Sequence, residues 1–203
     1  MSTAPQHAIG RGPLWEATLE DLASRWLDLP ANGSIAAEFT PEQIARRVTE
    51  RVGRVRRYCE VPAAPALDSP RRWETSWRRE KMRDAILAAL ERQGWKVSIS
   101  GRRNMSAPEI ASAFPIGEQT IVLEWWVIEE RARRLSEAGL LIPFSADDAM
   151  VLMLAEELFL ASATRMGNPP AHPWIDELAR HLFAKDVLGL PFTPLAAELA
   201  RTR

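Results

Sequence analysis

Residues 145–165 read SADDAMVLMLAEELFLASATR and contain the most hydrophobic helical segment of this 203-residue chain. Ser145 is a typical N-cap, and Asp147 and Asp148 supply the acidic side chains that favour the first turn of a helix. The segment 147–165 is apolar around most of the circumference of a helix, so it predicts a helix buried on most sides. This segment indicates a mainly α protein.

Further helices are expected because apolar residues recur at helical spacing elsewhere in the chain. Capping residues and prolines mark where these helices begin, and glycine or proline marks where they end. Seven to eight helices are therefore predicted, with at most two short strands, at 95–100 and 140–144. The predicted helices besides 147–165 cover residues 14–28, 41–60, 70–93, 106–114, 118–138, 174–188 and 194–201.

The composition excludes several classes of protein. The chain has 46% hydrophobic residues, 26% charged residues and a net charge of −1. This composition excludes a disordered chain, a collagen-like chain and a small domain stabilised by disulfides. The single cysteine, Cys59, cannot form an internal disulfide, which favours a reducing, cytoplasmic location. No apolar run approaches the ~20 residues that cross a bilayer, and residues 1–12 lack the apolar core of a secretory signal. No membrane partner is therefore expected.

Charge is distributed unevenly along the chain. Residues 41–83 hold twelve Lys and Arg against six Asp and Glu, whereas residues 145–203 hold five against eight. This asymmetry permits a polyanionic partner at the basic part, or docking of one chain's basic part on another's acidic part. The alternative explanation is that these arginines only make the helix faces compatible with solvent, which would give the same charge distribution.

Residues 107–126, APEIASAFPIGEQTIVLEWW, resemble the helix-turn-helix family of DNA-binding segments. Ala111 stands at the small position where two helices touch in that motif, and the motif's apolar positions hold Ile110, Phe114, Ile116 and Ile121. Together with the helix and strand before this segment, residues 80–144 resemble a winged-helix domain.

The resemblance implies a nucleic-acid surface. In the family, the residues just after the turn face the major groove, and here they include Gln119 and Thr120, with Arg102 and Arg103 as nearby cations. Acidic residues such as Glu118 and Glu124 on the same helix would repel phosphates. A packing unit that serves protein contacts is therefore the alternative.

The resemblance also sets the expected domains. Residues 1–13 are predicted to be a flexible tail and 14–60 an N-terminal helical part. Residues 70–144 are predicted to be a helix-turn-helix-like domain, and 145–203 a C-terminal helical part.

Residues 150–191 resemble zincin-type metallopeptidases that cleave phage repressors. That family has a His-Glu-x-x-His helix, and its two zinc histidines align here with Glu156 and Leu160, while Glu157 aligns with the general base. Because two histidines make the site bind zinc, the resemblance implies a catalytically inactive relative. Ordinary amphipathic-helix composition is the alternative explanation.

A divalent-metal site is a second hypothesis for the same region. Glu177 and His181 are four residues apart, hence on one helix face, and Glu156 or Glu157 could approach them from the buried helix. Carboxylates with one imidazole suit iron, manganese or zinc. The alternative is a surface pair between Glu177 and His181 without any cofactor.

Eight tryptophans suggest extensive contacts. Trp125 and Trp126 point about 100° apart on a helix, so at least one faces away from the core and favours a protein partner or self-association. The leading hypothesis is a non-enzymatic helical binding protein that is regulatory or binds nucleic acid, with no cofactor. The alternatives are a metal-binding or inactive metallopeptidase relative, and an oligomeric adaptor or assembly subunit.

Overall fold

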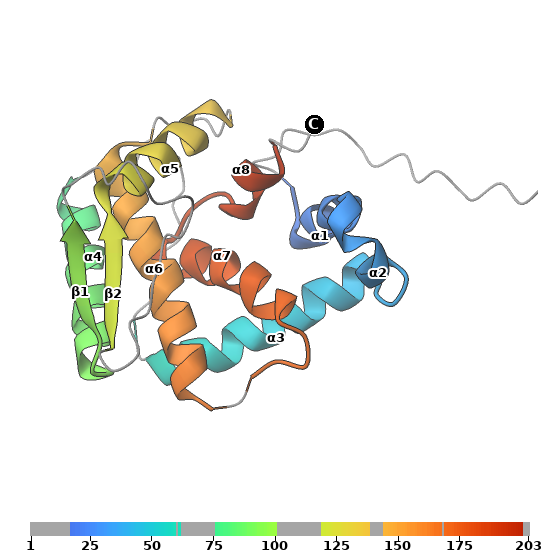
Figure 1. Cartoon of the computed structure of the whole chain (residues 1–203), viewed down its shortest axis with the longest axis horizontal. Coiled ribbons are helices and arrows are strands. Elements are labelled where there is room, and N and C mark those ends of the chain that lie inside the picture. Colours follow the sequence, from blue (N-terminus) through green and yellow to red (C-terminus); the bar gives the residue numbers. More distant parts are fainter. Residues whose placement is uncertain are drawn as a thin grey trace, which may run out of the picture.

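In the computed structural model of the chain, helix α6 (Ala146–Arg165) lies at the centre, and helices α3, α4, α5 and α7 pack against it (Figure 1). The structure describes residues 17–59, 61, 76–100, 119–138, 144–167 and 169–200. The Ser145 hydroxyl accepts a hydrogen bond from the Asp148 N–H, and the Asp148 carboxylate accepts one from the Ser145 N–H. Side chains on nearly every face of α6 are buried, which confirms the predicted central helix.

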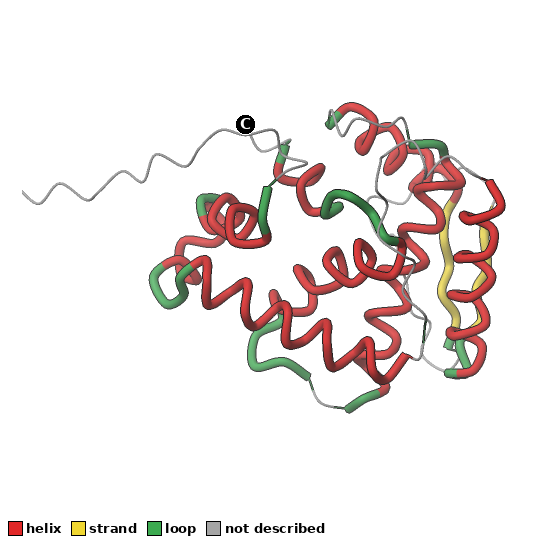
Figure 2. The backbone as a smooth tube through the Cα atoms, turned by 180° about the vertical axis from the view of Figure 1, so that it is seen from behind, coloured by secondary structure: helices red, strands yellow, loops and turns green. Residues whose placement is uncertain are grey.

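The mainly α class is also confirmed. Within the described residues there are eight α-helices, one 3-10 turn and two short strands (Figure 2). Their bounds, beside those of α6, are α1 (Leu19–Leu27), η2 (Pro30–Asn32), α2 (Gly33–Ala36), α3 (Pro41–Cys59), α4 (Ser76–Arg92), β1 (Lys96–Ser100), β2 (Thr120–Glu124), α5 (Trp125–Glu137), α7 (Trp174–Leu188) and α8 (Leu195–Leu199).

The helix predicted over 118–138 is wrong in its first part, because residues 120–124 form strand β2. This strand pairs in parallel with β1, in a register that runs from Lys96 opposite Thr120 to Ser100 opposite Glu124. Ile121 and Leu123 are buried, whereas their neighbours are partly exposed, so the burial alternates as in a strand. The β-branched residues of this segment favour such a strand once a partner is available.

Two other predicted elements fall largely outside the described residues. These are the helix at 106–114 and the strand at 140–144, of which the structure describes Phe144 alone. The predicted tail at 1–13 lies outside them as well.

A single hydrophobic core joins side chains from all three predicted parts of the chain. Helix α3 packs against α7 as well as α6, and α1 packs against α3 and α8. The basic part therefore contacts the acidic part within one chain. Arg51 forms a two-point ion pair with Asp176 at 2.7 and 3.1 Å, and Arg56 lies 3.9 Å from Asp186.

Arg51→Ala is expected to lower the free energy of unfolding by about 2 kcal/mol, because Asp176 would lose a charged partner at the α3–α7 contact. Arg51 is only 2% exposed, so water would not readily replace it. Urea unfolding followed by circular dichroism measures the change. Arg54→Ala, an exposed neighbour on the same helix, is the control, and an equal loss in both variants would contradict the assignment.

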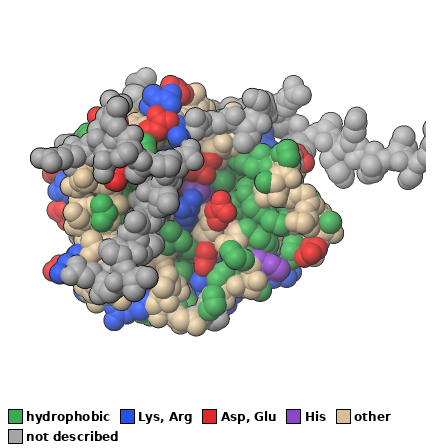
Figure 3. Space-filling view, in the orientation of Figure 1, with side chains coloured by type: hydrophobic (Ala, Val, Ile, Leu, Met, Phe, Trp, Pro, Cys, Tyr) green, Lys and Arg blue, Asp and Glu red, His purple; other side chains and the backbone are tan. Residues whose placement is uncertain are grey.

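No helix in the described parts of the chain combines the length and the apolar character that a membrane span requires. Basic and acidic side chains are instead interspersed on the face of the molecule seen in Figure 3.

Candidate functional site

A cavity of about 410 Å³ lies between α5, α6 and α7. Helix α5 provides one wall, α6 the second and α7 the third. The lining residues are Trp126, Val127, Glu130, Arg131 and Arg134 from α5, Met153, Glu156 and Glu157 from α6, and Arg180 from α7. The cavity thus combines apolar walls with charged groups of both signs.

Helical periodicity brings these side chains together. On α5, residues 126, 130 and 134 recur every four positions, so they share one side of the helix. Ile128, Ala132 and Leu135 lie on the adjacent side, which packs into the core. The cavity therefore lies at the edge of the core, at the boundary between the apolar face and the charged face of α5.

At the cavity, four ionisable side chains are joined by hydrogen bonds and ion pairs in a ring, here called the charged ring: Arg131 of α5, Glu156 of α6, His181 of α7 and Glu198 of α8. Glu156 Oε1 accepts hydrogen bonds from His181 Nδ1 at 2.8 Å and from Arg131 at 3.1 Å. Arg131 also donates to Glu198, and His181 Nε2 lies 3.4 Å from Glu198 Oε2. Each member comes from a different helix, so the ring ties four helices together.

The charges in the ring stabilise one another. Burial alone would raise the pKa of Glu156, but Arg131 and His181 outweigh it and lower that pKa to about 2. Burial likewise opposes ionisation of Glu198, yet His181 and Arg131 hold the pKa of Glu198 far below its usual value. For His181, burial lowers the pKa, but Glu156 and Glu198 more than compensate and raise it. The ring thus combines two carboxylates with the Arg131 guanidinium and with an imidazole whose protonated form the carboxylates favour.

Glu157 differs from its neighbour Glu156. Its side chain is buried, with 8% of the residue exposed, and its Oε2 has no hydrogen-bond partner among the described residues. Burial raises the pKa of Glu157 to about 7, with an opposing contribution from Arg180 and a further raising one from Glu156. A buried carboxyl that titrates near neutral pH in a cavity is a recognised mark of a functional site.

Arg180 presents a second unsatisfied group at the cavity. Its Nε is buried and makes no hydrogen bond to any residue that the structure describes. Buried polar atoms are nearly always paired in folded proteins, so such a donor and acceptor at one cavity need an explanation. A bound molecule that supplies both missing partners would provide it.

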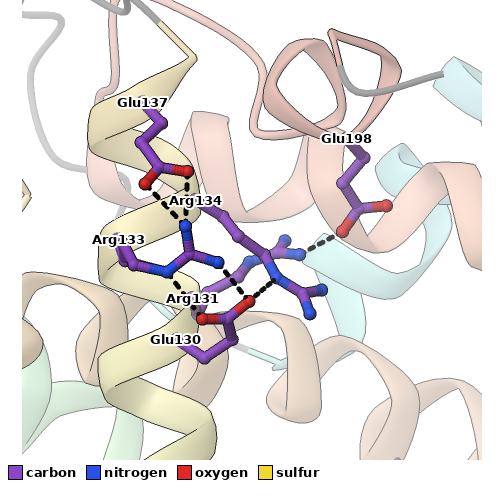
Figure 4. A network of polar contacts seen from close by, with 6 residues as sticks. All are labelled: Glu130, Arg131, Arg133, Arg134, Glu137 and Glu198. Carbon is purple, nitrogen blue, oxygen red and sulfur yellow. Dashed lines mark hydrogen bonds and ion pairs between the residues drawn. The ribbon is translucent and has the colours of Figure 1, made fainter. Parts of the chain in front are cut away.

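Surface ion pairs of α5, shown in Figure 4, involve the cavity-lining residues Glu130 and Arg134. Glu130 accepts hydrogen bonds from Arg134 and Arg133, each at 2.7 Å, and Arg133 also pairs with Glu137. These hydrogen bonds to Arg133 and Arg134 lower the pKa of Glu130 to about 2. Arg134, a lining residue whose side chain is partly exposed, is therefore held in place by Glu130.

Of the three residues predicted as metal ligands, the structure brings two together. Glu156 and His181 are in contact, but Glu177 is exposed, whereas His181 is fully buried. Glu156 is also paired with Arg131, at 3.1 Å. Within the described ranges, no group of three or more His, Cys, Asp and Glu side chains is placed to hold a metal ion.

Two of the four residues predicted to bind nucleic acid are described, and neither lines this cavity. Gln119 is exposed and immediately precedes β2, its carbonyl accepting the Lys96 N–H at 2.7 Å, and Thr120 begins that strand. Neither stands on a helix that could enter a groove. Arg102 and Arg103 lie outside the described residues.

The tryptophan pair of α5 is divided between core and cavity. Trp125 packs against the hydrophobic core and donates to Glu129 at 3.1 Å. Trp126, which donates to Glu124, lines the cavity. The tryptophan expected to face away from the core therefore lies beside the candidate site.

Sequence reasoning missed Arg131, Arg180 and Glu198. A signal existed for Arg131, which lies three residues after Ile128 and four before Leu135 and is therefore close to the apolar stripe of α5. Glu198 stands among apolar residues in the short segment 195–199, which also favours burial. Arg180 carries no comparable signal in its sequence neighbourhood.

Comparisons of the chain with protein-family models, with curated proteins and with solved structures found no match. The candidate site is therefore interpreted from its own geometry.

Proposed function

We propose that this chain is a helical binding protein whose ligand site is the cavity between α5, α6 and α7. The observation that carries the proposal is the buried carboxyl of Glu157, a residue that lines this cavity and whose Oε2 has no hydrogen-bond partner in the described structure. A volume of about 410 Å³ is within the range of small-molecule sites.

The lining residues define the chemistry of the ligand. Glu157 requires an N–H or O–H donor, and the Nε of Arg180 requires an acceptor or an anionic group. Trp126 and Met153 offer apolar contact to the rest of the molecule. The expected ligand is a small compound with a donor and an acceptor group a short distance apart, attached to a planar or apolar body.

The charged ring supports this role because it fixes the walls of the cavity before any ligand arrives. Arg131 and Glu156 belong both to the ring and to the cavity lining. Side chains held in this way lose little conformational freedom when a ligand binds, which favours affinity. The ring is thus a scaffold, and Glu157, Arg180 and the unpaired Nε of Arg131 are available to contact the ligand.

A fragment screen by crystal soaking tests the proposal, because it surveys many small chemical groups at once and requires no single chosen ligand. Fragments that carry an amide, amidine or carboxylate are expected to collect in this cavity, with polar contacts to Glu157 or Arg180. Glu157→Leu should abolish their binding, whereas Glu177→Gln, an exposed carboxyl on α7, should leave it unchanged. Fragments that bind elsewhere and leave the cavity empty would contradict the proposal.

A further inference from the structure

Helix α3 carries a strongly basic surface away from the cavity. Six arginines and two glutamates lie among its 19 residues. The apolar side of the helix, with Ile44, Val48 and Val55, packs into the core. Three of the arginines lie on the side of α3 that faces the loop between α6 and α7.

A second, smaller cavity of about 250 Å³ lies on this side of α3. Arg47, Arg51 and Arg54 line it from the helix, together with Glu50. These arginines are four and three positions apart, so they project from one side of α3. The opposite wall consists of the apolar residues Pro169, Pro170, Ala171 and Ile175.

Two of the three guanidinium groups are held in place. Arg51 is fixed by its two-point ion pair with Asp176. Arg47 lies over the ring of Phe39, with its Cζ 5.1 Å from the ring centroid. The Nε of Arg47 is nevertheless buried and has no hydrogen-bond partner in the part of the chain that the structure describes. This cavity therefore also contains a donor that requires an acceptor.

The charge balance favours an anion. Glu50 and Asp176 offset two of the three arginines, which leaves one positive charge at the cavity. The planar fork of arginine matches the oxygens of a phosphate group, which it binds through paired hydrogen bonds. We propose that the cavity of Arg47, Arg51 and Arg54 is a binding site for a phosphate group.

Two sources can present such a group: a free phosphorylated small molecule and the backbone of a nucleic acid. Arg46 and Arg57, both exposed, are further arginines of α3 that lie outside the cavity. A free phosphate compound needs only the cavity, whereas a nucleic-acid strand would also contact these flanking arginines. The proposal does not depend on the ligand site between α5, α6 and α7, since the two share no residue.

Titration calorimetry with the full chain tests this proposal. The probes are inorganic phosphate, pyrophosphate, and a single strand and a duplex of about 12 nucleotides, each at about 50 and 200 mM salt. At least one probe is expected to bind, and Arg47→Ala with Arg54→Ala should weaken that binding by about tenfold or more. The matched control is Arg92→Ala with Lys96→Ala, which removes the same charge from exposed sites elsewhere and should leave binding unchanged.

The pattern of binding identifies the source. Binding of phosphate or pyrophosphate supports a free phosphorylated compound, and salt-sensitive binding of the oligonucleotides alone supports a nucleic-acid backbone. If the double alanine variant does not fold, Arg47→Lys with Arg54→Lys keeps the charge but removes the fork, and should still weaken binding. Failure of all four probes to bind at low salt, or an equal loss in the control, would overturn the proposal.

Discussion

Arg131→Met is expected to lower the free energy of unfolding by about 3–5 kcal/mol, because it takes the guanidinium partner away from the buried Glu156 and the partly exposed Glu198. Arg131 donates to both carboxylates, and its side chain is 16% exposed. Equilibrium unfolding in urea, followed by tryptophan fluorescence and circular dichroism, measures the loss.

The matched control is Arg133→Met on the same helix. The Arg133 side chain is 52% exposed and pairs only with surface carboxylates among the described residues, so a change within about 0.5 kcal/mol is expected. A loss for Arg131→Met no larger than that of the control would contradict the charged ring.

A further variant distinguishes two causes of the stability loss: the loss of favourable ion pairs, and the cost of a buried charge without a partner. Replacing the whole ring by apolar residues of similar volume (Arg131→Met, Glu156→Leu, His181→Leu and Glu198→Leu) should restore much of the stability, because no buried charge then remains unpaired. A quadruple variant less stable than Arg131→Met alone would show that the ring contributes net attraction.

Glu157→Gln is expected to stabilise the protein by about 2–3 kcal/mol at about pH 8 and to leave stability unchanged at about pH 4. Burial raises the pKa of Glu157 from 4.5 to about 7 in the folded chain. Below pH 4.5 the carboxyl is protonated in both the folded and the unfolded states, so it adds no cost. As the pH rises toward 7, the unfolded state ionises first and the wild type loses stability.

The difference between wild type and Glu157→Gln isolates this carboxyl, because the other titrating groups are common to both proteins. Unfolding free energies measured in urea between about pH 4 and pH 8 give that difference directly. Glu177→Gln, which replaces an exposed carboxyl on α7 outside the cavity, is the control variant. A wild type that is more stable than Glu157→Gln at about pH 8 would mean that Glu157 has a favourable partner.

The central part of the fold could be predicted because its signals are local. Helix α6 has a capping box at Ser145 and apolar residues on most of its faces, and both features act within a few residues of one another. Strand β2 could not be predicted in the same way. Residues 121, 125 and 128 fit a helical spacing, and the strand depends on pairing with β1, a separate segment earlier in the chain.

Only some residues of the candidate site could be predicted from the sequence. Glu156 and His181 stand on adjacent, largely apolar helices, so their proximity followed from burial, and they are 2.8 Å apart. Their partners Arg131 and Glu198 depend on how α5 and α8 pack on α6 and α7, which no local pattern specifies. The same two residues therefore suggested a metal site, whereas the structure places an arginine between the carboxylates.

A ¹³C NMR titration of the Glu157 carboxyl, with and without a fragment bound in the cavity, would test the ligand site most directly. A midpoint near pH 7 in the free protein is expected, and it should shift when a bound fragment donates a hydrogen bond to the carboxylate. A midpoint near 4.5, or one that no cavity fragment moves, would contradict the role of Glu157 as the ligand-contacting group.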